Sequence, residues 1–179
     1  MALKVRTVVT MTLQKFLLEE FEREVTRSRR VLEQVPDGKY DWKPHDRSMA
    51  FGYLADMVAT IPNWIAMQIV RDELDIAPTD GSTMRQEPNR TSAALVAALD
   101  SAAAAARAAL GNTTDGHLGS RWQLKARGTV VQEAPRVEMI QDTMNHWAHH
   151  RGQMTVYLRL MGAKVPALYG PSADEASFG

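Results

Sequence analysis

The residues with the clearest chemical potential are three histidines within five positions, His146, His149 and His150. Each residue of an α-helix advances about 100°, so His146 and His150 share one helix face, one turn apart. Two imidazoles at this spacing can bind one divalent metal ion. His149 diverges from His150 by about 100° and is the weaker candidate for a shared ion. Asp142, one turn before His146, continues the row, either as a carboxylate that orients an imidazole or as a further ligand.

The histidine pair alone does not define a reaction, and a structural role in the helix is its alternative interpretation. The zinc-protease motif H-E-x-x-H is absent, because Trp147 stands at the position of the general base. The nucleophile elbow, the P-loop and the dinucleotide-binding glycine motif are absent from the sequence as well. The other two histidines, His45 and His117, fall in segments that we expect to be exposed loops.

Composition excludes several classes of function. The 179 residues, 45% of them hydrophobic, suit a single globular domain over residues 1–179. Lys plus Arg and Asp plus Glu both number 21, so no net charge favours nucleic acid or an anionic membrane. The absence of cysteine excludes disulfides and a cysteine nucleophile, and suits a cytoplasmic protein. The charge-free stretch Met57–Val70 is shorter than the roughly 20 residues of a membrane span, and we expect no targeting segment.

Four helices are expected to position the histidines. The first, from about Thr10 to Gln34, carries an apolar stripe at three- and four-residue spacing. The second spans about Ser48 to Arg71 and should kink at Pro62, which lacks the backbone N–H. The third is alanine-rich and runs from the N-cap Thr91 to Gly111 as its C′ residue. The fourth runs from about Pro135 to Met161 and contains the three histidines.

Three other segments complete the predicted fold. The polar stretch from Asp75 to Arg90 is expected to be a long loop, either a functional lid or simply mobile. The segment from Arg121 to Gln132 predicts a short β-hairpin that turns at Arg127-Gly128. The tail from Ala163 to Gly179 is expected to be extended and to pack back on the helices. The whole pattern predicts an all-α fold, a four-helix bundle with a short hairpin before the last helix and an extended C-terminal tail.

Several segments resemble the DinB/YfiT-like superfamily. They are the last-helix runs Asn145–Gln153 (NHWAHHRGQ) and Tyr157–Leu160 (YLRL), the C-terminal run Val165–Glu175, and the first-loop residues Trp42–Pro44 and Ser48-Met49. The similarity extends over about residues 8 to 175, nearly the whole chain. The two C-terminal motifs are the most specific part of it.

The resemblance implies a four-helix bundle, often a homodimer, with a divalent metal ion held by three histidines. Two of the ligands map to His146 and His150. The third maps to the run Leu54–Trp64 of the second helix, where Met57 occupies the position of the family histidine. A thioether is a poor ligand for Zn²⁺ or Ni²⁺ and suits Cu(I) better. Three readings follow in order: the metal site is lost and Met57 is a core residue, or the site binds Zn²⁺ or Ni²⁺ weakly with Asp142, water or an added ligand, or it selects a softer metal.

The superfamily includes S-transferases that use the low-molecular-weight thiols bacillithiol and mycothiol, and a thiol-dependent isomerase, in which a metal activates the thiol. If this protein is catalytic, the resemblance implies metal-dependent thiol transfer or a related hydrolase-like reaction on a small-molecule substrate. The alternative is a non-catalytic small-molecule-binding or dimerising bundle that has lost its metal. Nucleic-acid binding is disfavoured by the charge balance. The residues expected to line the cavity are Tyr53, Met57, Thr60, Trp64 and Tyr157, from their helical spacing relative to Met57 and His146.

Overall fold

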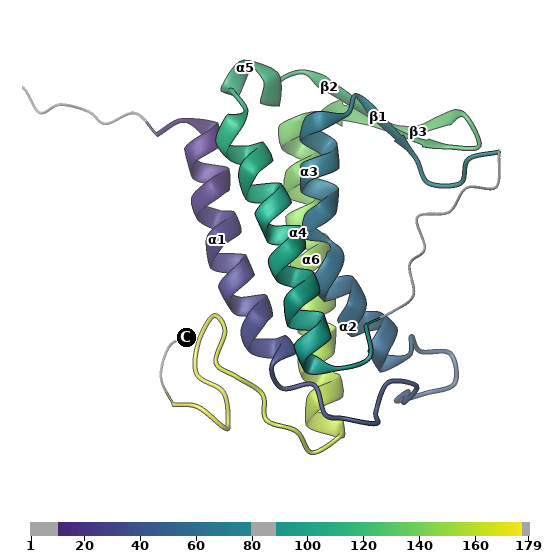
Figure 1. Ribbon diagram of the computed structural model, residues 1–179, viewed down its shortest axis with the longest axis vertical. Coiled ribbons are helices and arrows are strands. Elements are labelled where there is room, and N and C mark those ends of the chain that lie inside the picture. The colour runs from purple at the N-terminus through teal and green to yellow at the C-terminus, as the bar shows by residue number, and fades with distance from the viewer. Residues whose placement is uncertain (1–10, 80–88, 177–179) are drawn as a thin grey trace, which may run out of the picture.

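The computed structural model describes residues 11–79 and 89–176, and within these ranges it contains six helices and one three-stranded sheet (Figure 1). The helices are α1 (Leu13–Leu32), α2 (Phe51–Thr60), α3 (Pro62–Val70), α4 (Ser92–Asn112), α5 (Asp115–Leu118) and α6 (Arg136–Leu160). The strands are β1 (Glu73–Asp75), β2 (Arg121–Ala126) and β3 (Thr129–Pro135). In Figure 1, α1, α4, α6 and the consecutive α2 and α3 stand alongside one another, and the sheet lies at one end.

The first helix begins at Leu13, the first residue of its apolar stripe. Thr12 is the N-cap, and its hydroxyl accepts a hydrogen bond from the Lys15 amide at 3.1 Å. The Asp115 carboxylate also accepts hydrogen bonds from the amides of Leu13 and Gln14, at 3.1 and 3.0 Å. A carboxylate at this position satisfies helix donors without partners and complements the positive end of the helix dipole. The predicted start at Thr10 lies outside the described residues, as do residues 80–88 of the predicted loop and residues 177–179 of the tail.

The second predicted helix is two helices. The helix is interrupted at Ile61, and Pro62 is the first residue of α3. Proline is favoured there because its missing N–H would have no partner in the first turn, whereas inside a helix its ring clashes with the preceding turn. The helical segment begins at Phe51 rather than Ser48, because the backbone of Ala50 is still extended. Both halves bury apolar residues, including Leu54 in α2 and Ile65 in α3.

The alanine-rich helix α4 begins as predicted and ends differently. The Thr91 hydroxyl accepts from the Ala94 amide at 3.1 Å, which confirms the N-cap. Gly111 is not the C′ residue: it lies inside α4, without a positive φ, and the helix ends at Asn112. Thr114, two residues on, caps α5 through the His117 amide at 3.2 Å. The new helix cap, rather than the glycine, therefore sets the end of α4.

Within the described ranges, α4 is also the one helix that is long and apolar enough to cross a membrane by length and composition. It packs against α1, α2 and α3, and 39% of its most apolar window is buried. A core helix passes the same test, so this is weak evidence for a membrane span.

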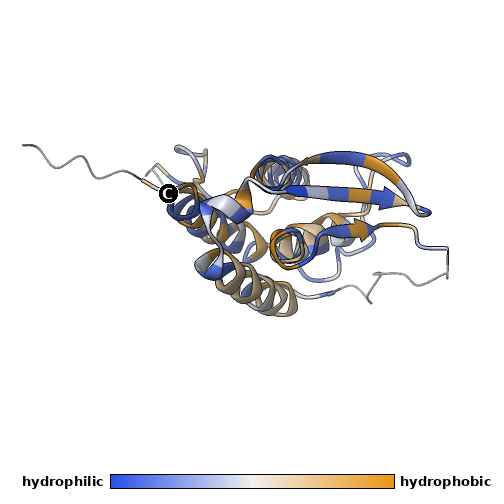
Figure 2. Cartoon of the chain, turned by 90° about the horizontal axis from the view of Figure 1, so that it is seen from above, coloured by the Kyte–Doolittle hydropathy of each residue, from blue (hydrophilic) through white to orange (hydrophobic). Residues whose placement is uncertain are grey.

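The fold is mostly helical but not all-α as predicted, because the predicted hairpin is part of a three-stranded sheet. The turn between β2 and β3 lies at Arg127 (φ 53°) and Gly128 (φ 75°), which confirms its place and gives the two left-handed residues typical of a tight hairpin. Strand β1, which follows α3, adds a parallel neighbour on the other side of β2. The register aligns Leu74 with Leu124 and Leu124 with Gln132 across the three strands. Figure 2 shows the sheet extending from the ends of α3 and α6.

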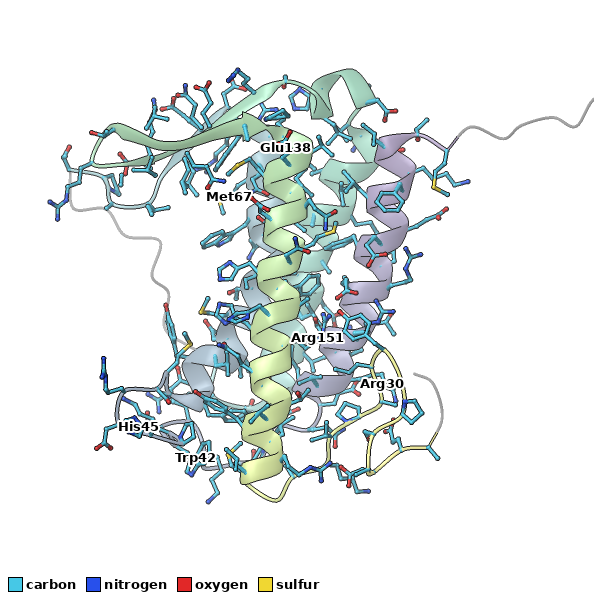
Figure 3. All side chains as sticks on the ribbon, turned by 180° about the vertical axis from the view of Figure 1, so that it is seen from behind. Arg30, Trp42, His45, Met67, Glu138 and Arg151 are labelled. Carbon is cyan, nitrogen blue, oxygen red and sulfur yellow. The ribbon has the colours of Figure 1, made fainter. Side chains whose placement is uncertain are left out.

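The C-terminal tail packs back on the helices, as expected. Arg151 of α6 is fully buried and its guanidinium contacts Glu24 and Ser28 of α1 and the hydroxyl of Tyr169 in the tail. Arg30 of α1 donates to the Ala167 carbonyl of the tail at 2.7 Å. Figure 3 shows Arg151 on the side of α6 that faces α1. These contacts fix the rotation of α6 and hence the direction of its other faces.

Candidate functional site

Helix α6 brings His146 and His150 together as their spacing predicts. Their Nε2 atoms lie 2.7 Å apart and their ring centroids 4.5 Å apart. A tetrahedral zinc ion with Zn–N bonds of about 2.0–2.1 Å separates two ligand nitrogens by about 3.3 Å. Small rotations of the two side chains would therefore open enough room for a shared ion. The pair already points both nitrogens at a common place.

A neighbouring amide orients His150. Its Nδ1 lies 2.9 Å from Oε1 of Gln153, one turn further along α6. With that oxygen as the acceptor, Nδ1 carries the proton and Nε2 presents its lone pair to His146 or to an ion. A hydrogen bond on the far nitrogen of an imidazole ligand is a regular feature of protein metal sites. Sequence reasoning did not single out Gln153, although its i,i+3 spacing from His150 was available.

The environment of His146 favours its neutral form. Burial lowers the pKa of His146, and the nearby imidazoles of His150 and His149 lower that pKa further. A neutral imidazole is the form that binds a metal ion. Trp64 of α3 packs edge-on against His146, with ring centroids 6.0 Å apart. The indole thus supplies part of the partly buried environment that disfavours the charged ring.

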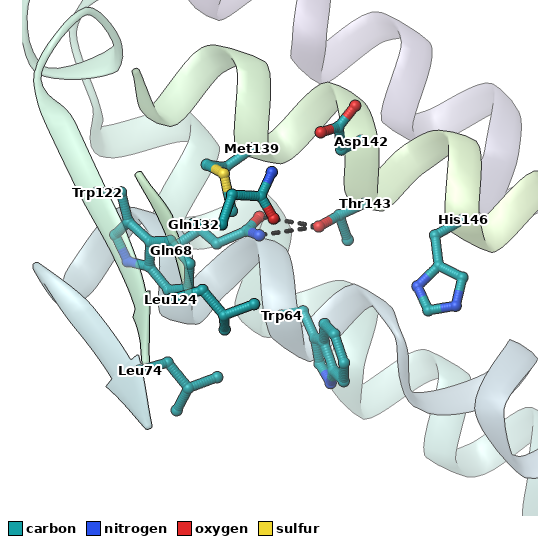
Figure 4. Close-up of a pocket in the computed structure, with 10 residues that line it drawn as sticks. All are labelled: Trp64, Gln68, Leu74, Trp122, Leu124, Gln132, Met139, Asp142, Thr143 and His146. Atoms are coloured by element: carbon teal, nitrogen blue, oxygen red, sulfur yellow. Dashed lines mark hydrogen bonds between the residues drawn. The ribbon is translucent and has the colours of Figure 1, made fainter. Parts of the chain in front are cut away.

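A pocket of about 210 Å³ opens beside His146 (Figure 4). The sheet supplies Leu74, Trp122, Leu124 and Gln132. The helices supply Trp64 and Gln68 from α3 and Met139, Asp142, Thr143 and His146 from α6. Of the residues predicted to line the cavity, this pocket contains Trp64. It also brings Asp142 and His146 to one wall.

Three of the predicted cavity residues on α2 have other surroundings. Tyr53 is 46% exposed. The Thr60 hydroxyl donates to the Asp56 carbonyl one turn earlier, at 2.9 Å. Met57 is half-buried and packs against the main hydrophobic core. None of the three is among the residues that line the pocket beside His146.

Tyr157 lies near the other end of α6. Its ring packs against Trp42 at 5.6 Å and Phe51 at 6.4 Å, and its hydroxyl donates to the Met49 carbonyl at 3.4 Å. In Figure 3, Trp42 stands at the end of the molecule opposite to Glu138. Eleven residues of helix correspond to about 16 Å along the axis. A shared direction in projection therefore does not bring Tyr157 to the pocket beside His146.

The remaining histidines differ from each other. His45 is exposed, as expected, and its Nδ1 accepts from the Arg47 amide at 3.1 Å. His117 does not lie in an exposed loop: it belongs to α5, is half-buried, and its Nε2 lies 2.8 Å from the Ile69 carbonyl near the end of α3. The prediction was wrong because α5 packs across the end of the helices and uses this ring to satisfy a carbonyl there. His149 is exposed, with its ring 5.2 Å from that of His150.

Comparison with known families shows how this arrangement is related to other proteins. The model of the DinB family matches residues 9–177. The chain belongs to the DinB family. Over 51 residues it is 43% identical to the uncharacterized protein YrdA of Bacillus subtilis (strain 168), and this match covers 28% of the chain and 30% of YrdA.

Two solved structures share the DinB fold with this protein. A DinB-like protein from Bacillus cereus ATCC 10987 has a TM-score of 0.66 at 22% identity, over 86% of this chain and 95% of that one. The DinB-like protein YjoA from Bacillus subtilis has a TM-score of 0.65 at 19% identity, over 89% of this chain and 99% of that one. At such low identity these likenesses establish the fold and leave the chemistry to the site itself.

This DinB-family chain offers an incomplete donor set for a metal ion. Within residues 11–79 and 89–176, no three His, Cys, Asp or Glu side chains form a group that could hold an ion. Catalytic zinc sites use three protein ligands and leave one position open. Here His146 and His150 supply two nitrogens, and Met57 stands at the position expected for the third ligand. Two nitrogens fall one protein ligand short of such a site.

Proposed function

We propose that this DinB-family protein holds a divalent metal ion, Zn²⁺ or Ni²⁺, weakly through His146 and His150, within a four-helix bundle. The observation that carries the proposal is the approach of the two Nε2 atoms to 2.7 Å, with the Nδ1 of His150 held by Gln153. Two imidazoles that point their Nε2 atoms at one place, one of them held by a hydrogen bond on its far nitrogen, form a regular arrangement of metal ligands.

The reaction that we propose for this site is S-transfer: the sulfur of a low-molecular-weight thiol, having given its proton to water, would form a bond to an electrophilic carbon of a small-molecule substrate, and the leaving group of that carbon would depart with the electron pair of the broken bond. A bound divalent ion lowers the pKa of a coordinated thiol and supplies a thiolate at neutral pH. The chain itself would bind the ion through His146 and His150 and orient His150 through Gln153. Trp64 and the apolar wall of the pocket would exclude water from one side of His146.

Metal titration tests this proposal. We would strip the protein of metal and titrate Zn²⁺ and Ni²⁺ by calorimetry into wild type, His146→Ala, His149→Ala and Met57→His. We expect one weak site per chain in wild type, its loss in His146→Ala, no change in His149→Ala, and tighter binding in Met57→His. The loss of a ligand should exceed the roughly 10–100-fold effect of losing an outer hydrogen-bond partner. Equal binding by wild type and His146→Ala would refute the proposal.

A second candidate function is a non-catalytic small-molecule-binding or dimerising bundle. Met57 favours it, because this side chain packs against the hydrophobic core as methionine does when it fills a gap. In that case neither wild type nor Met57→His would bind metal, and Cu(I) would not bind either. Light scattering would then report whether the chain is a homodimer in solution.

A further inference from the structure

The pocket beside His146 is built by the three strands of the sheet and by the helices α3 and α6. One row across the sheet consists of Leu74, Leu124 and Gln132, and all three residues line the pocket. Alternate residues of a strand share one face, so Trp122 extends the same wall along β2. Helix α6 adds Met139 and Thr143 at the i,i+4 spacing of one helix face, and His146 follows one turn later. The sheet therefore forms one wall of this pocket.

The inner wall offers no charge to a ligand. Leu74, Trp122 and Met139 are 7%, 1% and 5% exposed. Gln68 and Thr143 hydrogen-bond to each other, at 2.9 and 3.2 Å, so their polar groups are already satisfied. The pocket is lined by no lysine or arginine of the described chain.

Asp142 is the one carboxylate among the lining residues. It is exposed, and in Figure 4 it stands away from the Gln68–Thr143 pair. In the metal-free protein, an anion buried against this inner wall would find no lysine or arginine side chain, and the free energy of its desolvation would not be recovered.

The chemistry of the lining favours an aromatic ring. The indoles of Trp64 and Trp122 flank the pocket, and Met139 adds a thioether. Aromatic faces and thioether sulfur both interact favourably with aromatic rings. A cavity of about 150 Å³ lined by apolar side chains holds benzene. At about 210 Å³, this pocket suits one substituted ring or a small fused bicycle.

We propose that the pocket binds an uncharged aromatic group, whose exposed end lies at His146. As the substrate class of the S-transfer proposed above, this inference rests on that proposed function. The binding of the ring itself needs no metal, since none of the interactions with Leu74, Trp122 or Met139 involves one. His150, which the metal proposal requires, does not line the pocket.

The test uses two probes that share the naphthalene ring and differ in the charge of the substituent. We would titrate 2-naphthol, which is neutral at pH 7, and naphthalene-2-sulfonate, which is an anion, into metal-stripped protein by calorimetry. Leu124→Trp and Gln132→Trp would fill the pocket from two strands. Val131→Trp is the matched control, because Val131 lies on the same hairpin, is 57% exposed and does not line the pocket. Thermal unfolding would verify that each variant is folded.

We expect 2-naphthol to bind wild type and Val131→Trp equally, at one site per chain. Binding should weaken by about tenfold or more in each pocket-filling variant that folds. Naphthalene-2-sulfonate should bind at least about tenfold more weakly than 2-naphthol. Equal binding by wild type and a folded Leu124→Trp or Gln132→Trp, or equal binding of the two probes, would overturn the inference.

The same titrations in His150→Ala separate the two proposals. We expect this variant to lose Zn²⁺ binding and to retain 2-naphthol. Wild-type protein that binds Zn²⁺ but not 2-naphthol would overturn the aromatic pocket and leave the metal site standing. Wild-type protein that binds 2-naphthol but not Zn²⁺ would overturn the metal site and leave the pocket.

Discussion

Replacement of Glu24 by glutamine should destabilise this protein far more than its position on a surface helix suggests. Glu24 lies on α1 but its side chain is only 5% exposed, and the partner Arg151 of α6 is 1% exposed. Arg151 also donates hydrogen bonds to Ser28 Oγ, at 2.9 Å, and to the Tyr169 hydroxyl. Glu24→Gln keeps the shape of the side chain and removes its charge, so that Arg151 becomes a buried cation without a counter-ion.

The expected magnitude follows from this burial. Removal of one partner of a buried ion pair costs about 3–5 kcal/mol, because the other charge is left without compensation. Glu22 is the matched control on the same helix, since its ion pair with Arg107 has side-chain exposures of 42% and 47%. Solvent screens such a pair, and Glu22→Gln should cost at most about 1 kcal/mol. For a chain of this size, each kcal/mol shifts the melting temperature by about 2–4 °C.

Chemical denaturation of wild type, Glu24→Gln and Glu22→Gln measures these free energies of unfolding. The double variant Glu24→Leu/Arg151→Met should lose less stability than Glu24→Gln, because it leaves no unpaired charge in the interior. Equal destabilisation by Glu24→Gln and Glu22→Gln would refute the reasoning. The ion pair between Glu24 and Arg151 also bears on the site, since Arg151 follows His150 and its contact with α1 sets the direction in which that histidine points.

Three further predictions concern the same framework. Burial alone would raise the pKa of Glu24, but the charge of Arg151 and the hydrogen bonds to Glu24 more than offset this effect and hold the pKa below its usual value. The stability that the carboxylate contributes is therefore fully present above about pH 4.5 and is lost as the pH falls through the lower folded-state pKa. Urea denaturation at a series of pH values would show this loss. Arg136→Met should cost about 1–3 kcal/mol, because Arg136 is buried and donates at 2.8 and 2.7 Å to the carbonyls of Gln68 and Arg71 at the end of α3, and a thermal melt without loss of stability would contradict this. Gly128→Ala should cost about 1–2 kcal/mol because φ is 75° there, whereas Gly111→Ala, inside α4 and without a neighbour within 4 Å of the added carbon, should stabilise by about 0.5–1 kcal/mol in the same denaturation assay.

Much of the local structure could be predicted from the sequence, because it depends on residues close to one another along the chain. The N-cap at Thr91, the interruption at Pro62 and the turn at Arg127-Gly128 each follow from the conformational preference of a residue type. The pairing of His146 with His150 follows from the helical repeat alone. For the same reason the DinB resemblance could be found from short motifs.

Other features depended on contacts between distant segments. Strand β1 is three residues long, too short to show a pattern of its own, and it forms because β2 is there to pair with it. His117 and Arg136 have partners at the end of α3, 48 and 68 residues away in the sequence. No local pattern carries this information, since each of these residues is polar and would be satisfied equally well by water.

The candidate site shows the same division. The sequence determined which residues of α6 share a face, and hence the two possible metal ligands. It also determined that position 57 holds methionine rather than histidine. Tertiary structure alone decided what surrounds them: the strand row of Leu74, Leu124 and Gln132 closes a pocket next to His146, while Tyr157, on a similar face of the same helix, packs against Trp42 instead. A helical projection records direction around the axis, but which elements meet at a given height along it is set by how the helices and the sheet pack.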